Sequence, residues 1–229
     1  MPTPAHQTFR ESMNTGRDRW HDGEPYDLSA FAQMSPEEKE TVAREMLAKH
    51  QLDWRDMQVL AAVNSAKAFN KLRDLLDERQ PVQVQAFALR ELIGMPKRMG
   101  GSVADAKIRD LLERVTEHDG LTTVLQLAEQ HGGPWSKLAL LRGVRERPGL
   151  AIHFASSLLD MAGLSSDMAA FDPKFRPTLL NLLPDSTPDE RAAAFAKLCG
   201  WLDIDPATIP DRDGGQDIAW AEQQWPARR

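Results

Sequence analysis

The chain carries strong helix-start signals and no segment that sustains alternation of apolar and polar residues. Ser35-Pro36-Glu37-Glu38 has the order of a capping box, with serine at the N-cap, proline first in the helix and glutamate third. Pro188-Asp189-Glu190, after Thr187, is a second start of this kind. Elsewhere apolar residues recur at spacings of three and four, as from Phe69 to Leu76. The pattern predicts an all-α fold without a sheet.

The helix signals also predict how the chain is organised. They divide it into about nine to eleven helices of roughly 10 to 16 residues, too short and numerous for a four-helix bundle. We therefore expect stacked antiparallel helix pairs. The predicted parts are an irregular N-terminal cap (1–34), a helical stack (35–202) and an extended, acidic C-terminal segment (203–229).

Two stretches, 72–92 and 125–144, share an order of apolar helix, turn ending in proline, and second helix in which small and large residues alternate. Over roughly residues 55–160 the chain resembles the HEAT-like repeat family. The matching residues are Leu75, Leu76, Asp77, Pro81, Val84, Ala88 and Leu92. Gln85 stands where the family usually has arginine, and the turn is longer. The resemblance implies a curved α-solenoid whose concave face binds another protein.

A second resemblance concerns the whole layout. An N-terminal Trp-His-Asp-Gly-x-x-Tyr-Asp-Leu segment begins at Trp20, and the Ser-Pro-Glu-Glu helix and Asp53-Trp54-Arg55-Asp56 follow. A His-Phe-Ala-Ser-Ser-Leu-Leu helix begins at His153. This order is similar to small bacterial HEAT-like immunity proteins, which implies binding and neutralisation of a cognate antibacterial toxin.

Charge and composition narrow the classes of partner. The net charge is −6, and residues 1–60 (7 basic, 11 acidic) and 181–229 (5 basic, 9 acidic) are the acidic parts. An acidic chain without a long basic run is unsuited to neutralising many phosphates, so nucleic acid is disfavoured. The polar start 1–16 does not look like a secretory signal, and no apolar run approaches about 20 residues. We expect a cytoplasmic protein without a membrane partner.

Cys199 is the single cysteine, which excludes an intrachain disulfide. It lies in an Ala-rich helix with no histidine nearby, so we expect a small buried hydrophobe and not a nucleophile. The histidines have neither His-x-x-x-His nor Glu-x-x-His spacing. We expect no metal, no cofactor and no catalytic residue.

Trp20, His21, Asp22 and Tyr26 lie in the segment that helix formation explains least. They form either a partner-binding hairpin, since tryptophan and tyrosine are favoured anchors, or a cap over the end of the stack. Metal binding by His21 and Asp22 is disfavoured because adjacent side chains rarely converge on one ion.

Three further residues lie at a predicted helix start. Asp53 and Asp56 are either helix caps or an acid–base pair, and capping is the ordinary chemistry of carboxylates at that position. Trp54 belongs either to the core or to a binding surface.

Arg142 and Arg145 lie three residues apart on one helix face. They predict contact with an acidic partner or a phosphate backbone, or else a solvated face that compensates the helix dipole. The predicted partner-binding residues are Trp20, His21, Asp22, Tyr26, Asp53, Trp54, Asp56, Arg142 and Arg145.

Taken together, these patterns predict a non-enzymatic protein-binding module, most specifically an immunity protein that occludes a toxin. A basic partner would suit the acidic chain. The alternatives are a generic HEAT-like scaffold or assembly chaperone, and a HEAT-like DNA glycosylase with a basic concave groove.

Overall fold

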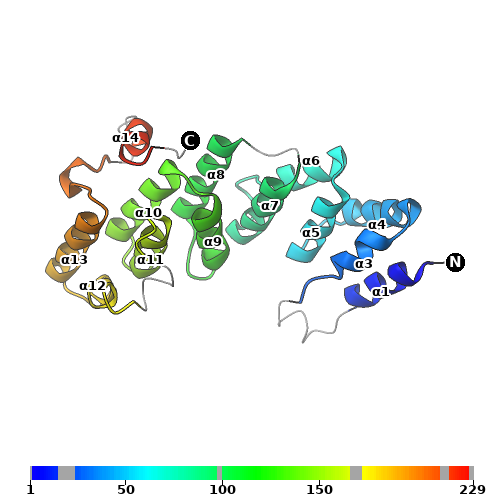
Figure 1. Ribbon diagram of the computed structural model, residues 1–229, viewed down its shortest axis with the longest axis horizontal. Helices are drawn as coiled ribbons and strands as arrows, with labels where there is room; N and C mark the ends of the chain where they lie inside the picture. Colours follow the sequence, from blue (N-terminus) through cyan, green and yellow to red (C-terminus); the bar gives the residue numbers. More distant parts are fainter. Residues whose placement is uncertain (1, 15–23, 97–99, 166–171, 212–216, 227–229) are drawn as a thin grey trace. The chain divides into compact units, whose positions relative to one another are not determined.

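The computed structural model describes residues 2–14, 24–96, 100–165, 172–211 and 217–226, and these residues contain thirteen α-helices, one 3-10 turn and no strand (Figure 1). The predicted all-α class is confirmed. The helix number exceeds the predicted nine to eleven, and α14 lies in the segment 203–229, where no helix was predicted. Within the described residues, no helix is long and apolar enough to cross a membrane.

The chain divides into two compact units, residues 1–80 with 87–98, and residues 81–86 with 99–229. The first unit contains five complete helices and most of a sixth. Their bounds are α1 Pro4–Met13, α3 Leu28–Gln33, α4 Pro36–Ala48, α5 Trp54–Val63, α6 Ala66–Asp74 and α7 Val82–Gly94, whose first turn belongs to the second unit.

The predicted capping box at the start of α4 is present, with Ser35 and Glu38 bonded reciprocally. Glu38 also accepts hydrogen bonds from the backbone N–H and the hydroxyl of Thr3, at 2.7 and 2.8 Å. Thr3 is the N-cap of α1. One carboxylate thus joins two helix starts, and it brings the N-terminal helix onto the unit, where Phe9 is fully buried.

The second unit contains seven complete helices, the 3-10 turn and the first turn of α7. Their bounds are α8 Gly101–Arg114, α9 Leu121–His131, α10 Pro134–Glu146, α11 Ala151–Met161, α12 Arg176–Leu180, α13 Pro188–Trp201, η1 Pro206–Thr208 and α14 Asp217–Gln224. Helix α10 packs on α8 and α11, α9 packs on α8 and α11, and α14 lies against α10 (Figure 1). The segment 203–229, predicted as extended, therefore contains a helix that packs on the unit.

The packed helix pairs differ from the predicted ones. We expected 125–144 to form one helix–turn–helix pair, but α9 and α10 each pack on α8 and α11 far more than on one another. Asp105 on α8 explains this. Its carboxylate accepts the backbone N–H groups of Gly133 at 2.8 Å and Trp135 at 3.0 Å, so α8 fixes the start of α10.

A second carboxylate acts in the same way on α7. Asp119, in the turn between α8 and α9, accepts the backbone N–H groups of Val82 and Gln83, both at 2.9 Å. Gly120 follows with a φ of 81°, and a Cβ there would lie 2.9 Å from the Gln83 nitrogen. Glycine is required by both its backbone conformation and this close approach.

Small residues bring α10 and α11 together. A Cβ added at Gly143 on α10 would lie 2.3 and 2.4 Å from two carbons of the fully buried Phe154 ring on α11. The ring therefore occupies the space that any larger residue would need. Gly143, one of the small residues that alternate with large ones in this stretch, thus allows α10 and α11 to pack closely.

Candidate partner-binding site

Tyr26 and Asp56, predicted to bind a partner, are 6% and 3% exposed and bond inside the first unit. Asp56 accepts hydrogen bonds from the Tyr26 hydroxyl at 3.3 Å, from the Lys49 ammonium at 2.6 Å and from the backbone N–H of Asp53 at 3.1 Å. Burial raises the pKa of the Tyr26 hydroxyl, and the nearby carboxylates of Asp56 and Asp53 add to the effect. These contacts leave little of Tyr26 or Asp56 exposed to a partner.

Asp53 caps α5, accepting the backbone N–H groups of Arg55 and Asp56 at 2.9 and 3.0 Å. The Arg55 guanidinium, buried against the Tyr26 ring at 4.8 Å, also pairs with the Asp53 carboxylate. Trp54 is half-buried, and its ring lies 6.5 Å from that of Phe87. Trp20, His21 and Asp22 lie outside the described residues.

Arg142 does meet acidic residues, but they belong to the same chain. Its guanidinium is 3% exposed and donates to the carbonyls of Pro210 (2.8 and 3.0 Å) and Asp211 (2.9 Å). It also pairs with the carboxylate of Asp217 at 3.3 Å. Arg142 thus fastens the C-terminal segment to α10, and this burial removes it from any exposed basic groove.

Arg145 remains exposed and pairs with Glu146 at 3.3 Å and with Asp211 at 3.4 Å. Such exposed pairs contribute little to stability, so Arg145 can exchange its partners at small cost. Of the two predicted arginines, only Arg145 presents its charge at the surface.

The most distinctive cavity of the second unit has two tryptophans in its lining, and we call it the tryptophan pocket. It has a volume of about 780 Å³ and lies among the α9–α10 turn, the ends of α11 and α13, and the end of α14. Trp201 and Trp225, both half-buried, line it together with Met161, Leu164 and Leu202. Leu164 is 39% exposed. Half-exposed tryptophans in a concave site are the side chains that most often anchor protein partners.

Aromatic packing fixes both tryptophans. The Trp201 ring packs edge-on against the buried Phe175 ring at 4.8 Å, and Trp225 packs edge-on against Trp220 at 5.7 Å. The Lys137 ammonium lies 5.9 Å from the Trp225 ring. These contacts restrict the motion of both rings, and a ring that is already restricted loses less entropy when a ligand binds to it.

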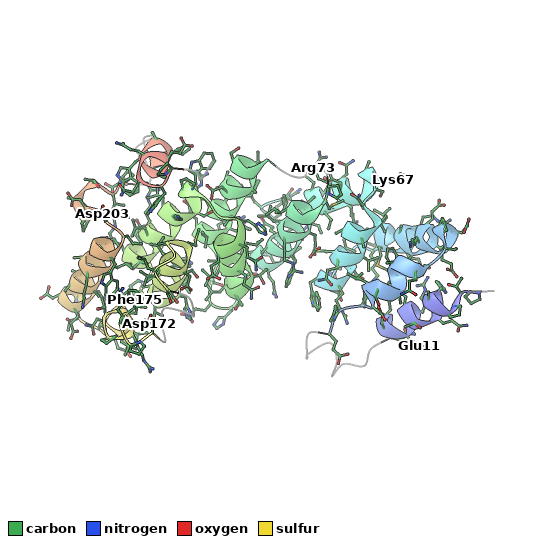
Figure 2. The ribbon with its side chains drawn as sticks, viewed as in Figure 1. Glu11, Lys67, Arg73, Asp172, Phe175 and Asp203 are labelled. Atoms are coloured by element: carbon green, nitrogen blue, oxygen red, sulfur yellow. The ribbon has the colours of Figure 1, made fainter. Side chains whose placement is uncertain are left out.

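A hydrogen bond joins the two tryptophan-bearing segments. Asp203, which follows α13 (Figure 2), has a φ of 57°, and its carbonyl accepts the side-chain amide of Gln224 at 3.2 Å. Gln224 immediately precedes Trp225. Together with Arg142, this bond positions the last helix so that Trp225 reaches the pocket.

The charged groups at the pocket are Glu129, Lys137 and Asp203. Glu129 is exposed and accepts the Ser157 hydroxyl at 2.6 Å, and the Asp203 side chain is also exposed. Aromatic faces beside carboxylates form a surface that attracts cationic side chains. The pocket is therefore suited to a partner that presents basic residues around an apolar anchor.

Sequence reasoning missed this pocket. Trp220 and Trp225 were recognisable as tryptophans in a polar tail, which is an unusual composition for a solvated segment. Trp201, which lines the same pocket as Trp225, lies 24 residues earlier in the sequence, and no spacing rule connects the two.

The described residues contain no group of three His, Cys, Asp or Glu side chains that could hold a metal ion. Cys199 is fully buried, as predicted, and burial raises the pKa of its thiol to about 11. A thiol with that pKa is a poor nucleophile at neutral pH.

Comparison with known proteins adds no assignment: no family model matches the sequence, and neither the curated proteins nor the solved structures give a match.

Proposed function

We propose that this protein is a non-enzymatic binding module that captures a partner protein through the tryptophan pocket. The observation that carries the proposal is the pair Trp201 and Trp225, held half-exposed in one concavity by the rings of Phe175 and Trp220. Tryptophan rings stabilise a fold most when they are fully buried. Two rings that are fixed and yet half-exposed are therefore best explained by a binding partner.

The sharper form of the proposal is that the partner is a toxin and the protein its cytoplasmic immunity protein. Its support is the resemblance of the layout to bacterial immunity proteins and the acidic net charge of −6. An acidic binder associates quickly with a basic enzyme and can cover its active site. The carboxylates of Glu129 and Asp203 beside the pocket suit the same partner. A solenoid arrangement of the helix pairs is part of this proposal.

The experiment begins with capture of partners from lysate of the source organism by the tagged protein, followed by reconstitution of each candidate as a purified pair. The expected result is one stoichiometric partner whose expression alone stops growth and whose co-expression with this protein is tolerated. Recovery of many proteins of one assembly would favour the scaffold alternative. If no purified pair forms, the binding proposal is wrong.

Substitutions then connect the partner to the pocket. Trp225→Ala should weaken the Kd at least about tenfold, the range of an anchor residue. Ile218→Ala is the matched control, since Ile218 lies on α14, the helix that Trp225 directly follows, is 36% exposed and does not line the pocket. Equal binding by both variants would show that the partner does not bind at the tryptophan pocket, although the partner itself would remain established.

A further inference from the structure

The first unit has a second concave surface, of opposite charge, which we call the α4 groove. It has a volume of about 500 Å³ and lies among α3, α4, the end of α5 and the start of α6. Apolar side chains of Leu28, Phe31, Leu47 and Val63 line it. Since Leu28, Leu47 and Val63 are only half-buried, the groove leaves part of an apolar surface uncovered.

Small residues explain why this surface is open. Ala32 on α3 and Ala62 on α5 both line the groove and are exposed, and Ala43 on α4 also lines it. Alanine side chains are too short to fill the space among three helices. A partner side chain could therefore enter without displacing any part of the core.

Cations surround the apolar lining. Lys39 and Arg44 reach it from α4 and Lys67 from α6, whereas Glu40 is the one carboxylate in the lining. Lys67 and Arg73 lie at opposite ends of α6 (Figure 2), and Arg73 is not part of the groove. The three groove cations thus come from two helices, and they outnumber the single carboxylate of the lining.

Several other cations of the first unit are neutralised by ion pairs. Arg10, Arg55, Arg79 and Arg90 each form an ion pair with a carboxylate. Among the described residues, no carboxylate lies within ion-pair distance of Lys39, Arg44 or Lys67.

Two of the three make hydrogen bonds to neutral oxygens instead. Lys39 donates to the carbonyl of Ala32 at 2.7 Å, and Arg44 donates to the Thr41 hydroxyl at 3.3 Å. Their positive charge is therefore not compensated by an ion pair, and it stands beside an open apolar surface.

We propose that the α4 groove binds an acidic amphipathic helix of a partner protein. An apolar stripe on such a helix would cover the leucines and Val63, and carboxylates flanking the stripe would meet the three cations. A single-chain anionic lipid fits less well, because it carries its charge at one end, whereas the cations extend along α4 and onto α6. The inference does not rest on the tryptophan pocket, which lies in the other unit and suits a basic partner.

The test uses two labelled model peptides of fourteen residues, each with a leucine stripe, one flanked by glutamates and one by lysines. Fluorescence anisotropy with the full chain should show saturable, one-to-one binding of the glutamate peptide, weakened by added salt. The lysine peptide should bind at least about tenfold more weakly. Equal binding of both peptides, or binding of neither, would overturn the proposal.

Two variants place the binding at the groove. Arg44→Glu with Lys67→Glu should weaken the Kd of the glutamate peptide at least about tenfold. Arg73→Glu with Arg79→Glu is the matched control, because it makes the same change of charge at exposed residues of the same unit that do not line the groove. An equal loss in both variants would mean that only overall charge matters, and would overturn the proposal.

Ala62→Trp gives an independent measurement, since the new ring would fill the groove without changing any charge. It should abolish binding of the glutamate peptide while circular dichroism and the thermal midpoint remain those of the parent. Binding of the glutamate peptide by Ala62→Trp would contradict the proposal.

Trp225→Ala should leave peptide binding unchanged, so that failure of the groove proposal and failure of the tryptophan-pocket proposal are distinguishable. Vesicles of phosphatidylglycerol that compete with the peptide for the groove would count against a protein partner.

Discussion

The hydroxyl of Ser136 on α10 donates to the carboxylate of Asp105 on α8, and the same carboxylate accepts the Ser136 backbone N–H at 3.0 Å. Both residues are buried, 5% exposed for Asp105 and 0% for Ser136. The negative charge lies at the positive end of α10, where the helix dipole and the first N–H groups favour it. One side chain therefore holds two helices together and defines where the second begins.

Asp105→Ala should destabilise the fold by about 3 kcal/mol or more, because several N–H groups at the buried start of α10 lose their acceptor. Asp105→Asn keeps one acceptor oxygen and should cost roughly half as much. Urea unfolding followed by circular dichroism gives both free energies. Asp110→Ala on the same helix is the control and should cost less than about 1 kcal/mol. Similar losses at both positions would contradict the role of Asp105.

Gly143→Ala should destabilise by about 1 to 3 kcal/mol, since the added methyl group would overlap the Phe154 ring. Gly200→Ala in α13 is the matched control, because nothing lies within 4 Å of its Cβ position. It should stabilise by up to about 1 kcal/mol through helix propensity. Thermal unfolding of the two variants separates the effects, and a shift of the same sign in both would argue against close packing at Gly143.

Arg142→Met should release α14 from α10, because it removes the hydrogen bonds to Pro210 and Asp211 and the ion pair with Asp217. We expect a loss of about 2 kcal/mol in the local stability of α14. Hydrogen exchange of the α14 amides, read by mass spectrometry, measures it directly. Arg145→Met should leave exchange nearly unchanged. Partner binding at the tryptophan pocket should weaken in Arg142→Met and not in Arg145→Met, although Arg142 itself is buried.

The packing of α1 on the first unit should weaken at acid pH, because it depends on the ionised carboxylate of Glu38. The hydrogen bond from the Thr3 backbone N–H is the largest cause that lowers the pKa of Glu38 from its ordinary value of 4.5 to about 2. The carboxylate therefore contributes stability above about pH 4.5, and this contribution is lost as pH falls through about 2.

Unfolding free energies of the parent and of Glu38→Gln, measured against pH, check this expectation. The difference between them should be constant near neutral pH and shrink below about pH 4.5. Glu11→Gln, at an exposed position of α1 (Figure 2), should show no such trend. A difference that persists unchanged at pH 2 would contradict the role given to the Glu38 carboxylate.

The Cys199 thiol should resist alkylation in the native protein, because it is fully buried and burial raises its pKa to about 11. Labelling by iodoacetamide at pH 8 should be at least about a hundredfold slower than in urea-unfolded protein. The rate follows from mass spectrometry of timed samples. Rapid native labelling would show that α13 opens readily.

Local signals in the sequence predicted much of the fold. The capping boxes at Ser35 and Thr187 have the expected reciprocal bonds, and Asp53 caps α5 as its position at a helix start indicates. Such signals are readable because a cap and the helix that it serves are within four residues of each other. The burial of Cys199 follows from its apolar surroundings in the same way.

Long-range polar contacts could not be read from the sequence. Asp105 is 28 to 31 residues from the N–H groups that it accepts, and Arg142 is 68 residues from Pro210. In the sequence, Arg142 looks like part of a basic surface, because no residue near it indicates that an acidic segment much later in the chain covers it. The tryptophan pocket also forms only because this later segment packs on α10, so it could not be predicted from the sequence either.

The cap that Asp119 provides for α7 has a consequence for synthesis. Val82 emerges from the ribosome 37 residues before the carboxylate that accepts its N–H. At about 5 to 20 residues per second, the first turn of α7 waits roughly 2 to 7 s for this partner. Slow codons between the two positions would lengthen that interval and faster ones would shorten it, so the rate of translation sets how long this helix start lacks its cap.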